Sequence, residues 1–229
     1  IRIEDVDPPR EVPGAAEQRL LTLADFGLHS EEAVPYQIRR NAFYRAASER
    51  LLAQGKAFHC HCSRADLASQ HGIHRHCAAS QQREHPAIRL RVTDGSHVTF
   101  NDALQGPIAQ DVDRDVGDFV LLRADGCWAY QLAVVVDDAE QRISHVVRGA
   151  DLVDSTPRQI LLQQALGMPT PHYLHLPLLL GSDGHKLSKS LTAMPVDANA
   201  PLPVLRWLWI ALGQAPATLD AAVTVAELL

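Results

Sequence analysis

The stretch ISHVVRGADLVDSTPRQILLQQALGMPTPHYLHLPLLL, residues 143–180, decides the fold class of this chain. Its end at 174–180 is an apolar run that predicts a buried strand, and its start at 143–149 predicts a further strand. Between them, the spacing of apolar residues over 154–167 predicts a helix that ends at Gly167. A strand, a helix and a second strand in this order predict an α/β sheet.

The sequence around this stretch continues the same alternation. Apolar residues spaced three or four apart predict helices, and short alternating or apolar runs predict strands. Helices are expected over 15–28, 35–55 and 201–213, single strands over 1–5, 87–92 and 97–102, and two strands over 118–139 joined by a turn at Asp125–Gly126.

Composition limits the kinds of function that the chain can have. It has 229 residues with 46% hydrophobic content, which is enough for a real core. The net charge of −6 offers no general basic surface, so any contact with nucleic acid is expected to be local. No apolar run has the length of a membrane span. The cysteines are clustered rather than spread as a disulfide framework, which favours a reducing, cytoplasmic location.

The segment HCHCSRADLASQHGIHRHC, residues 59–77, is rich in side chains that bind metals. Cys60, Cys62 and Cys77 offer three thiolates, and nearby histidines offer imidazole nitrogen. Thiolate and imidazole in a set of four favour a closed, structural zinc site, with one ion per chain. The alternative is a polar loop that is merely rich in Cys and His. Spacing alone leaves the fourth ligand open among His71, His74 and His76.

A second candidate site lies on the loop GSDGHKLSKS, residues 181–190. It places Lys186 and Lys189 beside Ser188, bounded by glycines. Two ammonium groups on such a loop suit the phosphates of ATP, because charge that develops on release of pyrophosphate needs cations already in place. A solvated basic turn is the alternative interpretation.

Three more residues are candidates for binding a small charged substrate. Glu4 follows the N-terminal strand, where it could receive an ammonium group or stabilise a turn. Tyr130 is expected within a strand, and Arg148 at the end of one. A buried strand-end arginine needs a carboxylate partner, which either a ligand or one of Asp151 and Asp154 would supply.

Three motifs in this order resemble those of class I aminoacyl-tRNA synthetases of the glutamyl type. They are RIEDVDPPR at 2–10, RGADL at 148–152 and KLSKS at 186–190. The first motif with its continuation to Glu17, together with the Cys-x-Cys pair, narrows the resemblance to the glutamyl-Q tRNA(Asp) synthetases of that family. The resemblance covers nearly the whole chain. It implies an α/β, Rossmann-type catalytic domain with a zinc-bearing insertion and a short C-terminal helical part.

The resemblance also implies an activity and its ligands. The family pattern is ATP-dependent activation of L-glutamate to glutamyl-adenylate, with Mg²⁺, and transfer of glutamate to the queuosine base at the wobble position of tRNA(Asp). The positions that match the family's substrate sites are Glu4, Tyr130 and Arg148 for glutamate and Lys189 for ATP, with Lys186 and Ser188 of the same loop as further expected ATP contacts. The family's zinc site includes a tyrosine whose position falls on His74, which implies the ligands Cys60, Cys62, His74 and Cys77, with His76 as the alternative fourth ligand.

The same resemblance divides the chain into parts. The catalytic core is expected in two parts, 1–55 and 87–190, with the zinc-binding insertion at 56–86 and a helical segment at 191–229. The family's first strand and its His-Ile-Gly-His-type motif would lie before Ile1, and a chain that begins at Ile1 is expected not to form the adenylate. We expect a monomer without membrane attachment.

Two other functions stay open. The first is the catalytic domain of a discriminating glutamyl-tRNA synthetase, which carries a large anticodon-binding region after the KLSKS motif. The short sequence after Ser190 favours the glutamyl-Q type instead. The second is an inactive, zinc-dependent RNA-binding relative of the synthetases, against which the three motifs count.

Overall fold

The computed structural model describes residues 1–181, 184, 186, 196–215 and 224–228. The chain forms two compact units. The larger unit comprises Glu4–Pro8 and Tyr36–Pro177, and the smaller comprises Ile1–Ile3, Pro9–Pro35 and Leu178–Leu229.

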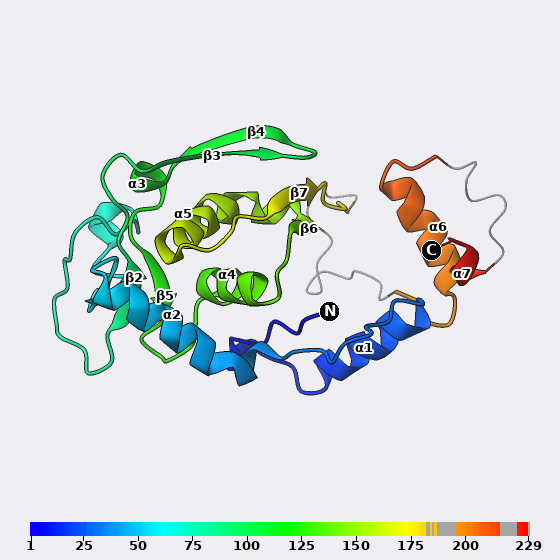
Figure 1. Cartoon of the computed structure of the whole chain (residues 1–229), viewed down its shortest axis with the longest axis horizontal. Coiled ribbons are helices and arrows are strands. Elements are labelled where there is room, and N and C mark those ends of the chain that lie inside the picture. The colour runs from blue at the N-terminus through cyan, green and yellow to red at the C-terminus, as the bar shows by residue number, and fades with distance from the viewer. Residues whose placement is uncertain (182–183, 185, 187–195, 216–223, 229) are drawn as a thin grey trace. The chain divides into compact units, whose positions relative to one another are not determined.

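The strand, helix and strand predicted over 143–180 are present in the larger unit. β6 (His145–Gly149) and β7 (His172–Leu176) pair in parallel, and α5 (Thr156–Leu166) connects them after the 3-10 helix η4 (Ala150–Ser155) (Figure 1). Gly167 ends α5 with a φ of 64°, a left-handed conformation that glycine adopts without steric cost. The α/β class is therefore confirmed.

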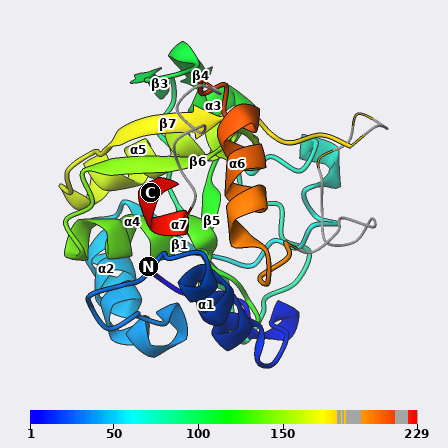
Figure 2. The ribbon, with the colours of Figure 1, turned by 90° about the vertical axis from the view of Figure 1, so that its right-hand side faces the viewer.

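Two further strands complete this sheet. β3 (His97–Asp102) lies on the other side of β7, and β4 (Gly106–Asp111) pairs with β3 in antiparallel fashion. The strand order is β4-β3-β7-β6. Figure 2 shows β6 and β7 side by side in the middle of the larger unit. The central position of β7 brings the ends of β3 and β6 to its two sides.

A second, antiparallel sheet carries the Cys/His segment. β2 (Ala87–Leu90) lies between β1 (Ala57–Cys60) and β5 (Phe119–Leu122). The chain leaves β1 at Cys60 and returns at the start of β2, with the 3-10 helix η3 (Ala68–Gln70) in between. Two neighbouring strands thus hold both ends of this long connection.

Helices pack with these sheets to form the core. α2 (Asn41–Ala53) follows the 3-10 helix η2 (Gln37–Arg40), and α4 (Tyr130–Glu140) follows β5, while α3 (Val112–Asp115) is a single turn after β4. The large apolar side chains with less than 2% exposure come from α2, β2, β5, α4 and α5 and are Tyr44, Leu51, Leu90, Leu121, Leu132, Leu162 and Leu166.

A buried carboxylate joins two of these helices. Asp137 of α4 is 0% exposed and accepts hydrogen bonds from Gln37 Nε2 at 2.7 Å, Arg40 Nε at 2.6 Å and Tyr44 Oη at 2.8 Å. A charge at this depth is tolerated because each bond replaces a lost interaction with water. The network holds α4, whose first residue is Tyr130, against η2 and α2.

Several predicted elements differ from those observed. The second strand expected within 118–139 is the helix α4, although the turn before it forms, with Arg123 N–H donating to the Cys127 carbonyl. Every α4 residue from Leu132 to Asp138 is buried, and a short run that is apolar on all sides has no period that separates strand from helix. Tyr130 therefore starts a helix rather than lying within a strand.

Smaller corrections concern the ends of elements. The expected strand at 1–5 is a single bridge at Ile3, whose N–H donates to the Pro35 carbonyl. The strand placed at 174–180 runs from His172 to Leu176, and β4 was not predicted. Cys127 is a half-exposed free thiol on the turn before α4.

The smaller unit contributes helices. α1 (Ala15–Asp25) and α6 (Pro201–Ala211) match the helices expected over 15–28 and 201–213, and α7 (Val225–Leu228) is a short final turn. Among the described residues, none of the helices has both the length and the apolar character needed to cross a membrane.

Candidate functional site

Four predicted metal ligands lie together in the larger unit. Their ligand atoms, from Cys60, Cys62, His74 and Cys77, all lie within 4.8 Å of one another. Ligand atoms around one tetrahedral zinc ion lie roughly 3.5 to 3.8 Å apart, so a small contraction completes the site. Cys60, Cys62 and His74 are buried, and Cys77 is exposed. This group can hold a metal ion.

Local structure explains how these residues meet. Cys60 is the last residue of β1 and Cys62 follows it directly after the strand. The chain then turns back at His71 and Gly72, which have positive φ angles of 54° and 79°. After the turn, the Ala78 N–H donates to Cys62 Sγ at 3.3 Å, as backbone amides do around metal-bound thiolates. The loop geometry required for four ligands is therefore already present.

Asp66 stabilises the base of this loop. Its Oδ2 accepts hydrogen bonds from the Ser63 hydroxyl at 2.6 Å and the Ser63 N–H at 2.7 Å, and its Oδ1 accepts one from the Ser80 hydroxyl at 2.7 Å. These bonds hold the pKa of Asp66 below its usual range, and those from Ser63 have the largest effect. The carboxylate thus ties the start of the loop to the residues that follow Cys77.

The ring of His74 is oriented from both sides. Its Nδ1 lies 2.8 Å from Asp118 Oδ2, and its Nε2 lies 3.6 Å from Cys77 Sγ. His74 is 2% exposed, whereas His71 and His76 lie on the surface. The His76 carbonyl accepts a hydrogen bond from Gln70 Nε2. Among the described residues, His74 is the histidine that completes the group of four.

The thiols in this group affect one another. Burial raises the pKa of Cys77, and the nearby charges of Cys60 and Cys62 raise it further. Burial also raises the pKa of Cys62. Both effects express the cost of placing negative sulfur partly out of water and close to other sulfur atoms, and a divalent cation would remove that cost. The donor set therefore fits a soft divalent metal.

The second group of predicted residues surrounds Arg148 of β6. Its Nε donates to His175 Nε2 at 3.0 Å, its Nη2 to Thr156 Oγ1 at 2.7 Å and to the Leu152 carbonyl at 3.4 Å, and its Nη1 to Tyr130 Oη at 3.3 Å. In the described part of the chain, none of these partners is a carboxylate. The pairing with Asp151 or Asp154, considered from the sequence, is not formed there.

Tyr130 lies between charges of opposite sign. Burial raises the pKa of its phenol, the positive charge of Arg148 lowers it, and the negative charge of Glu4 raises it. Glu4 itself is exposed, while Tyr130 and Arg148 are half-buried. The structure thus brings Glu4, Tyr130 and Arg148 together, with an anionic and a cationic group near one phenol.

Comparison with known proteins identifies the family. A family model for the catalytic domain of tRNA synthetases of class I (E and Q) matches residues 1–200. The chain belongs to the class I tRNA synthetases of the E and Q type.

Relatives within this family are close in sequence. A protein of Xanthomonas campestris pv. campestris (strain 8004) named glutamyl-Q tRNA(Asp) synthetase is 62% identical over 229 residues, which are 100% of this chain and 77% of the relative. A protein of the same name from Neisseria meningitidis serogroup C (strain FAM18) is 50% identical and covers 95% of this chain, which covers 78% of that relative.

Solved structures agree on the fold. A glutamate tRNA ligase from Elizabethkingia meningosepticum, crystallised in complex with its amino acid, matches 99% of this chain with a TM-score of 0.80 and 24% identity. The chain spans 56% of that solved chain. A likeness at this identity shows a shared class I synthetase fold.

Lys186, one of the residues predicted to contact ATP, the nucleotide that class I synthetases use, belongs to the smaller unit. Lys186 forms an isolated bridge with Leu180. Ser188 and Lys189, the other two predicted ATP contacts, lie outside the described residues.

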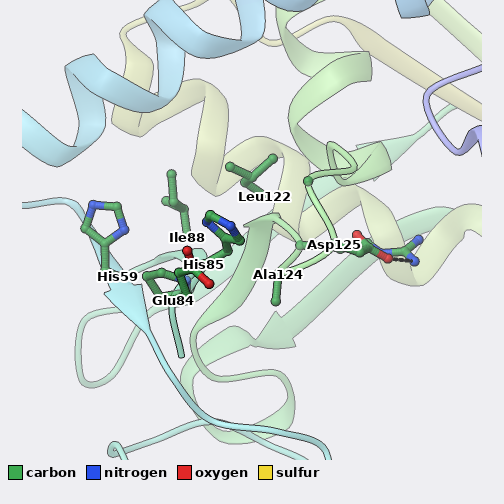
Figure 3. A pocket seen from close by; sticks show the side chains of 10 residues that line it. His59, Glu84, His85, Ile88, Leu122, Ala124 and Asp125 are labelled. Atoms are coloured by element: carbon green, nitrogen blue, oxygen red, sulfur yellow. Dashed lines mark hydrogen bonds and ion pairs between the residues drawn. The ribbon is translucent and has the colours of Figure 1, made fainter. Parts of the chain in front are cut away.

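A separate hollow lies beside the antiparallel sheet. It has a volume of about 570 Å³ and is lined by residues of β1, β2 and the turn after β5 (Figure 3). His59, Glu84 and His85 lie on one side of it, and Ala124 and Asp125 on the other. The lining includes neither the predicted metal ligands nor the residues around Arg148, so this hollow is distinct from both groups.

Three polar residues of these sites were missed by sequence reasoning. Asp118 contacts His74 from 44 positions away, and Asp102 contacts His175 from 73 positions away. No spacing rule connects residues so far apart along the chain. The only available signal was their type, because Asp and His are rarely buried without a partner.

Proposed function

We propose that this protein activates L-glutamate with ATP to form glutamyl-adenylate, and then transfers the glutamate to the queuosine base at the wobble position of tRNA(Asp). The observation that carries the proposal is the cluster of Glu4, Tyr130 and Arg148, which suits the charges of glutamate. The name shared by relatives at 62% and 50% identity supports the same choice.

The first role in this proposal belongs to Arg148 and Tyr130. The phenol oxygen accepts a hydrogen bond from Arg148 Nη1, and the phenol is also hydrogen-bonded to the Gln159 side chain. Arg148 and Tyr130 then form a pair that would bind one carboxylate of glutamate through the remaining Nη1–H. We assign this pair to the side-chain carboxylate, because a carboxylate held by a cation is a poor nucleophile. Glutamine, which lacks that charge, would bind more weakly.

Glu4 has the complementary role. Its exposed carboxylate lies close enough to Tyr130 to raise the pKa of that phenol, and it would bind the substrate ammonium. The amino acid is then held at two ends, which leaves the α-carboxylate to react. Holding a reactant at several points converts a bimolecular step into an effectively unimolecular one.

Two chemical steps follow. An α-carboxylate oxygen attacks the α-phosphorus of ATP, and the bond to the departing pyrophosphate breaks. A queuosine hydroxyl then attacks the acyl carbon, loses its proton and releases AMP. Lys186 and Lys189, with Ser188, would neutralise the charge on pyrophosphate, assisted by Mg²⁺.

The metal in this proposal is one zinc ion with a structural role. Cys60, Cys62, His74 and Cys77 would fill all four positions of a tetrahedral site, which leaves none open for a substrate. Its chemistry is therefore to hold the loop between β1 and β2. His76 is the alternative fourth ligand, although its ring lies on the surface.

The proposal includes an organisation of the chain. Catalytic residues would come from 1–55 and 87–190, the zinc-binding insertion from 56–86 and a short helical part from 191–229. We propose that the protein acts in the cytoplasm as a monomer and meets its tRNA through the catalytic domain.

A glutamylation assay on the full-length protein tests the function. Radiolabelled glutamate should be transferred to tRNA(Asp) that contains queuosine and not to the same tRNA without it. Pyrophosphate exchange into ATP should require glutamate but not tRNA. Equal charging of both tRNA(Asp) forms, or charging of tRNA(Glu), would favour a discriminating glutamyl-tRNA synthetase instead. Binding of RNA without any exchange would favour the inactive relative.

A further inference from the structure

A buried carboxylate and a buried imidazole lie directly behind Arg148. His175 of β7 is 0% exposed, and Asp102 at the end of β3 is 1% exposed. His175 Nδ1 lies 2.6 Å from Asp102 Oδ2, and Arg148 Nε lies 3.0 Å from His175 Nε2. Three neighbouring strands thus contribute one residue each to a continuous chain of hydrogen bonds.

The donors in this chain fix the tautomer of His175. A guanidinium N–H can only donate, so His175 Nε2 must accept from Arg148. Nδ1 therefore carries the hydrogen and donates it to Asp102. The Thr156 hydroxyl lies 3.3 Å from the same Nε2 and accepts from Arg148 Nη2. The imidazole thus presents a lone pair toward the guanidinium.

The backbone holds Asp102 in place and keeps it charged. Its Oδ1 accepts from the N–H groups of Leu104 at 3.0 Å, Gln105 at 2.9 Å and His175 at 3.2 Å. Burial alone would raise the pKa of Asp102, but the hydrogen bonds from Gln105, His175 and Leu104 lower it to about 2. A fixed negative charge therefore stands behind the imidazole.

These contacts leave Arg148 with one N–H donor for a ligand. A guanidinium has five N–H groups, and the partners in the described part of the chain take one on Nε, two on Nη2 and one on Nη1. One N–H of Nη1 remains, beside the Tyr130 hydroxyl. The Nε and Nη2 donors of the guanidinium thus all have partners. These bonds fix the direction of the remaining Nη1–H.

We propose that Asp102 and His175 are positioning residues that orient Arg148 for the side-chain carboxylate of glutamate. This inference rests on the proposed function, since it assigns the substrate carboxylate to Arg148. The Asp102 charge offsets that of the half-buried guanidinium through the imidazole ring, and the fixed tautomer holds the guanidinium in one orientation. Binding glutamate then requires little further ordering of the site.

Asp102→Asn tests the tautomer directly. The amide oxygen of the new side chain faces the three backbone N–H groups, so its NH₂ faces His175 Nδ1. The ring must then accept at Nδ1 and carry its hydrogen on Nε2, where it meets the Arg148 Nε–H. Two donors face each other, and Arg148 has to move. The KM for glutamate should rise about 10- to 100-fold, as for loss of a charged hydrogen bond, with kcat within about threefold.

His175→Asn is a second variant with a different disturbance. The shorter amide can still donate to Asp102 but does not reach Arg148. Its glutamate KM should rise in the same way, even if Asp102→Asn fails to fold. Two-bond ¹H–¹⁵N correlation spectra supply a readout apart from activity. They should show the hydrogen on Nδ1 of His175 in the unaltered protein and on Nε2 in Asp102→Asn.

Asp111→Asn is the matched control. Asp111 Oδ1 contacts His97 Nδ1 at 2.6 Å at the opposite end of the β3–β4 hairpin, where both side chains are about half exposed. This variant should leave the glutamate KM unchanged. Arg148→Lys serves as the reference for loss of the substrate contact.

The outcomes separate the two claims. If Arg148→Lys binds glutamate like the unaltered protein, the proposed function is wrong at Arg148. If Arg148→Lys loses glutamate while His175→Asn keeps a normal KM, the proposed function stands and the positioning role is overturned. A reversed tautomer with an unchanged glutamate KM in Asp102→Asn would overturn it as well.

Discussion

The imidazole of His74 is held at its Nδ1 by the Asp118 carboxylate, 2.8 Å away. This contact fixes the hydrogen on Nδ1 and directs the Nε2 lone pair toward the three cysteines. The other Asp118 oxygen accepts the Val92 N–H at 2.7 Å, and the Asp118 N–H donates to the His74 carbonyl. Asp118 thus connects the metal-binding group to the antiparallel sheet.

Asp118→Asn is expected to weaken metal binding without removing a ligand. The amide favours the opposite tautomer of His74, which places a hydrogen where the metal should bind. Loss of such an outer partner reduces metal affinity about 10- to 100-fold. Competition between the protein and a chromophoric chelator for Zn²⁺ measures the change. Asp115→Asn, at the exposed end of α3, is the control and should bind as before. Equal affinity in both variants would contradict the role of Asp118.

Substitution of two histidines tests the ligand set. His74→Ala should lose zinc during dialysis against a weak chelator, because three thiolates without the imidazole form an incomplete site. His76→Ala should keep one zinc ion per chain, since the His76 ring lies on the surface. Metal content measured by atomic absorption distinguishes them. Zinc retained in His74→Ala and lost in His76→Ala would mean that His76, and not His74, is the fourth ligand.

Gly117→Ala should disturb the same region through the backbone. Gly117 has a φ of 64° and pairs with His74, and an added Cβ would collide with the His74 carbonyl and lie 2.7 Å from the Ile73 methyl carbon. Strain in φ and the collision together should cost about 2 kcal/mol or more of unfolding free energy. Urea unfolding measures it, with Gly126→Ala as the control. Gly126 also has a positive φ but open space around it. Equal losses in both variants would show that φ strain alone acts.

The predictions that rest on local sequence patterns agree best with the structure. The strands around α5 and the end of that helix at Gly167 follow from apolar spacing and from the conformational freedom of glycine. The helix α4 did not follow, because the run Val134–Val136 favours a strand by propensity, and tertiary burial decides otherwise. Short runs that are apolar on every side remain ambiguous until their neighbours are known.

The site residues also differ in whether their partners are near or distant in the sequence. Cys60, Cys62, His74 and Cys77 lie in one short segment, so their types and spacing suggested them as a group. Asp118 and the pair of Asp102 and His175 reach their partners only through the pairing of strands distant in sequence. Residues that orient ligands are less visible in a sequence than the ligands, because nothing in their spacing marks them.

The pKa of Asp102 predicts a contribution to stability that depends on pH. Its folded-state pKa of about 2 lies below the ordinary pKa of 3.8 for an aspartate side chain. A depressed pKa favours the folded state at every pH above the unfolded value, and this benefit is lost as pH falls from about 4 to about 2. A difference of this size corresponds to roughly 2 kcal/mol.

Urea unfolding at a series of pH values measures this contribution. The unaltered protein should exceed Asp102→Asn in stability by a constant amount above pH 5, and the gap should narrow by roughly 2 kcal/mol as the pH approaches 2. Acid also releases any bound zinc and protonates other carboxylates, but these effects occur in both proteins and cancel in the difference. A gap that stays constant across the range would mean that the carboxylate titrates alike in the folded and unfolded chains.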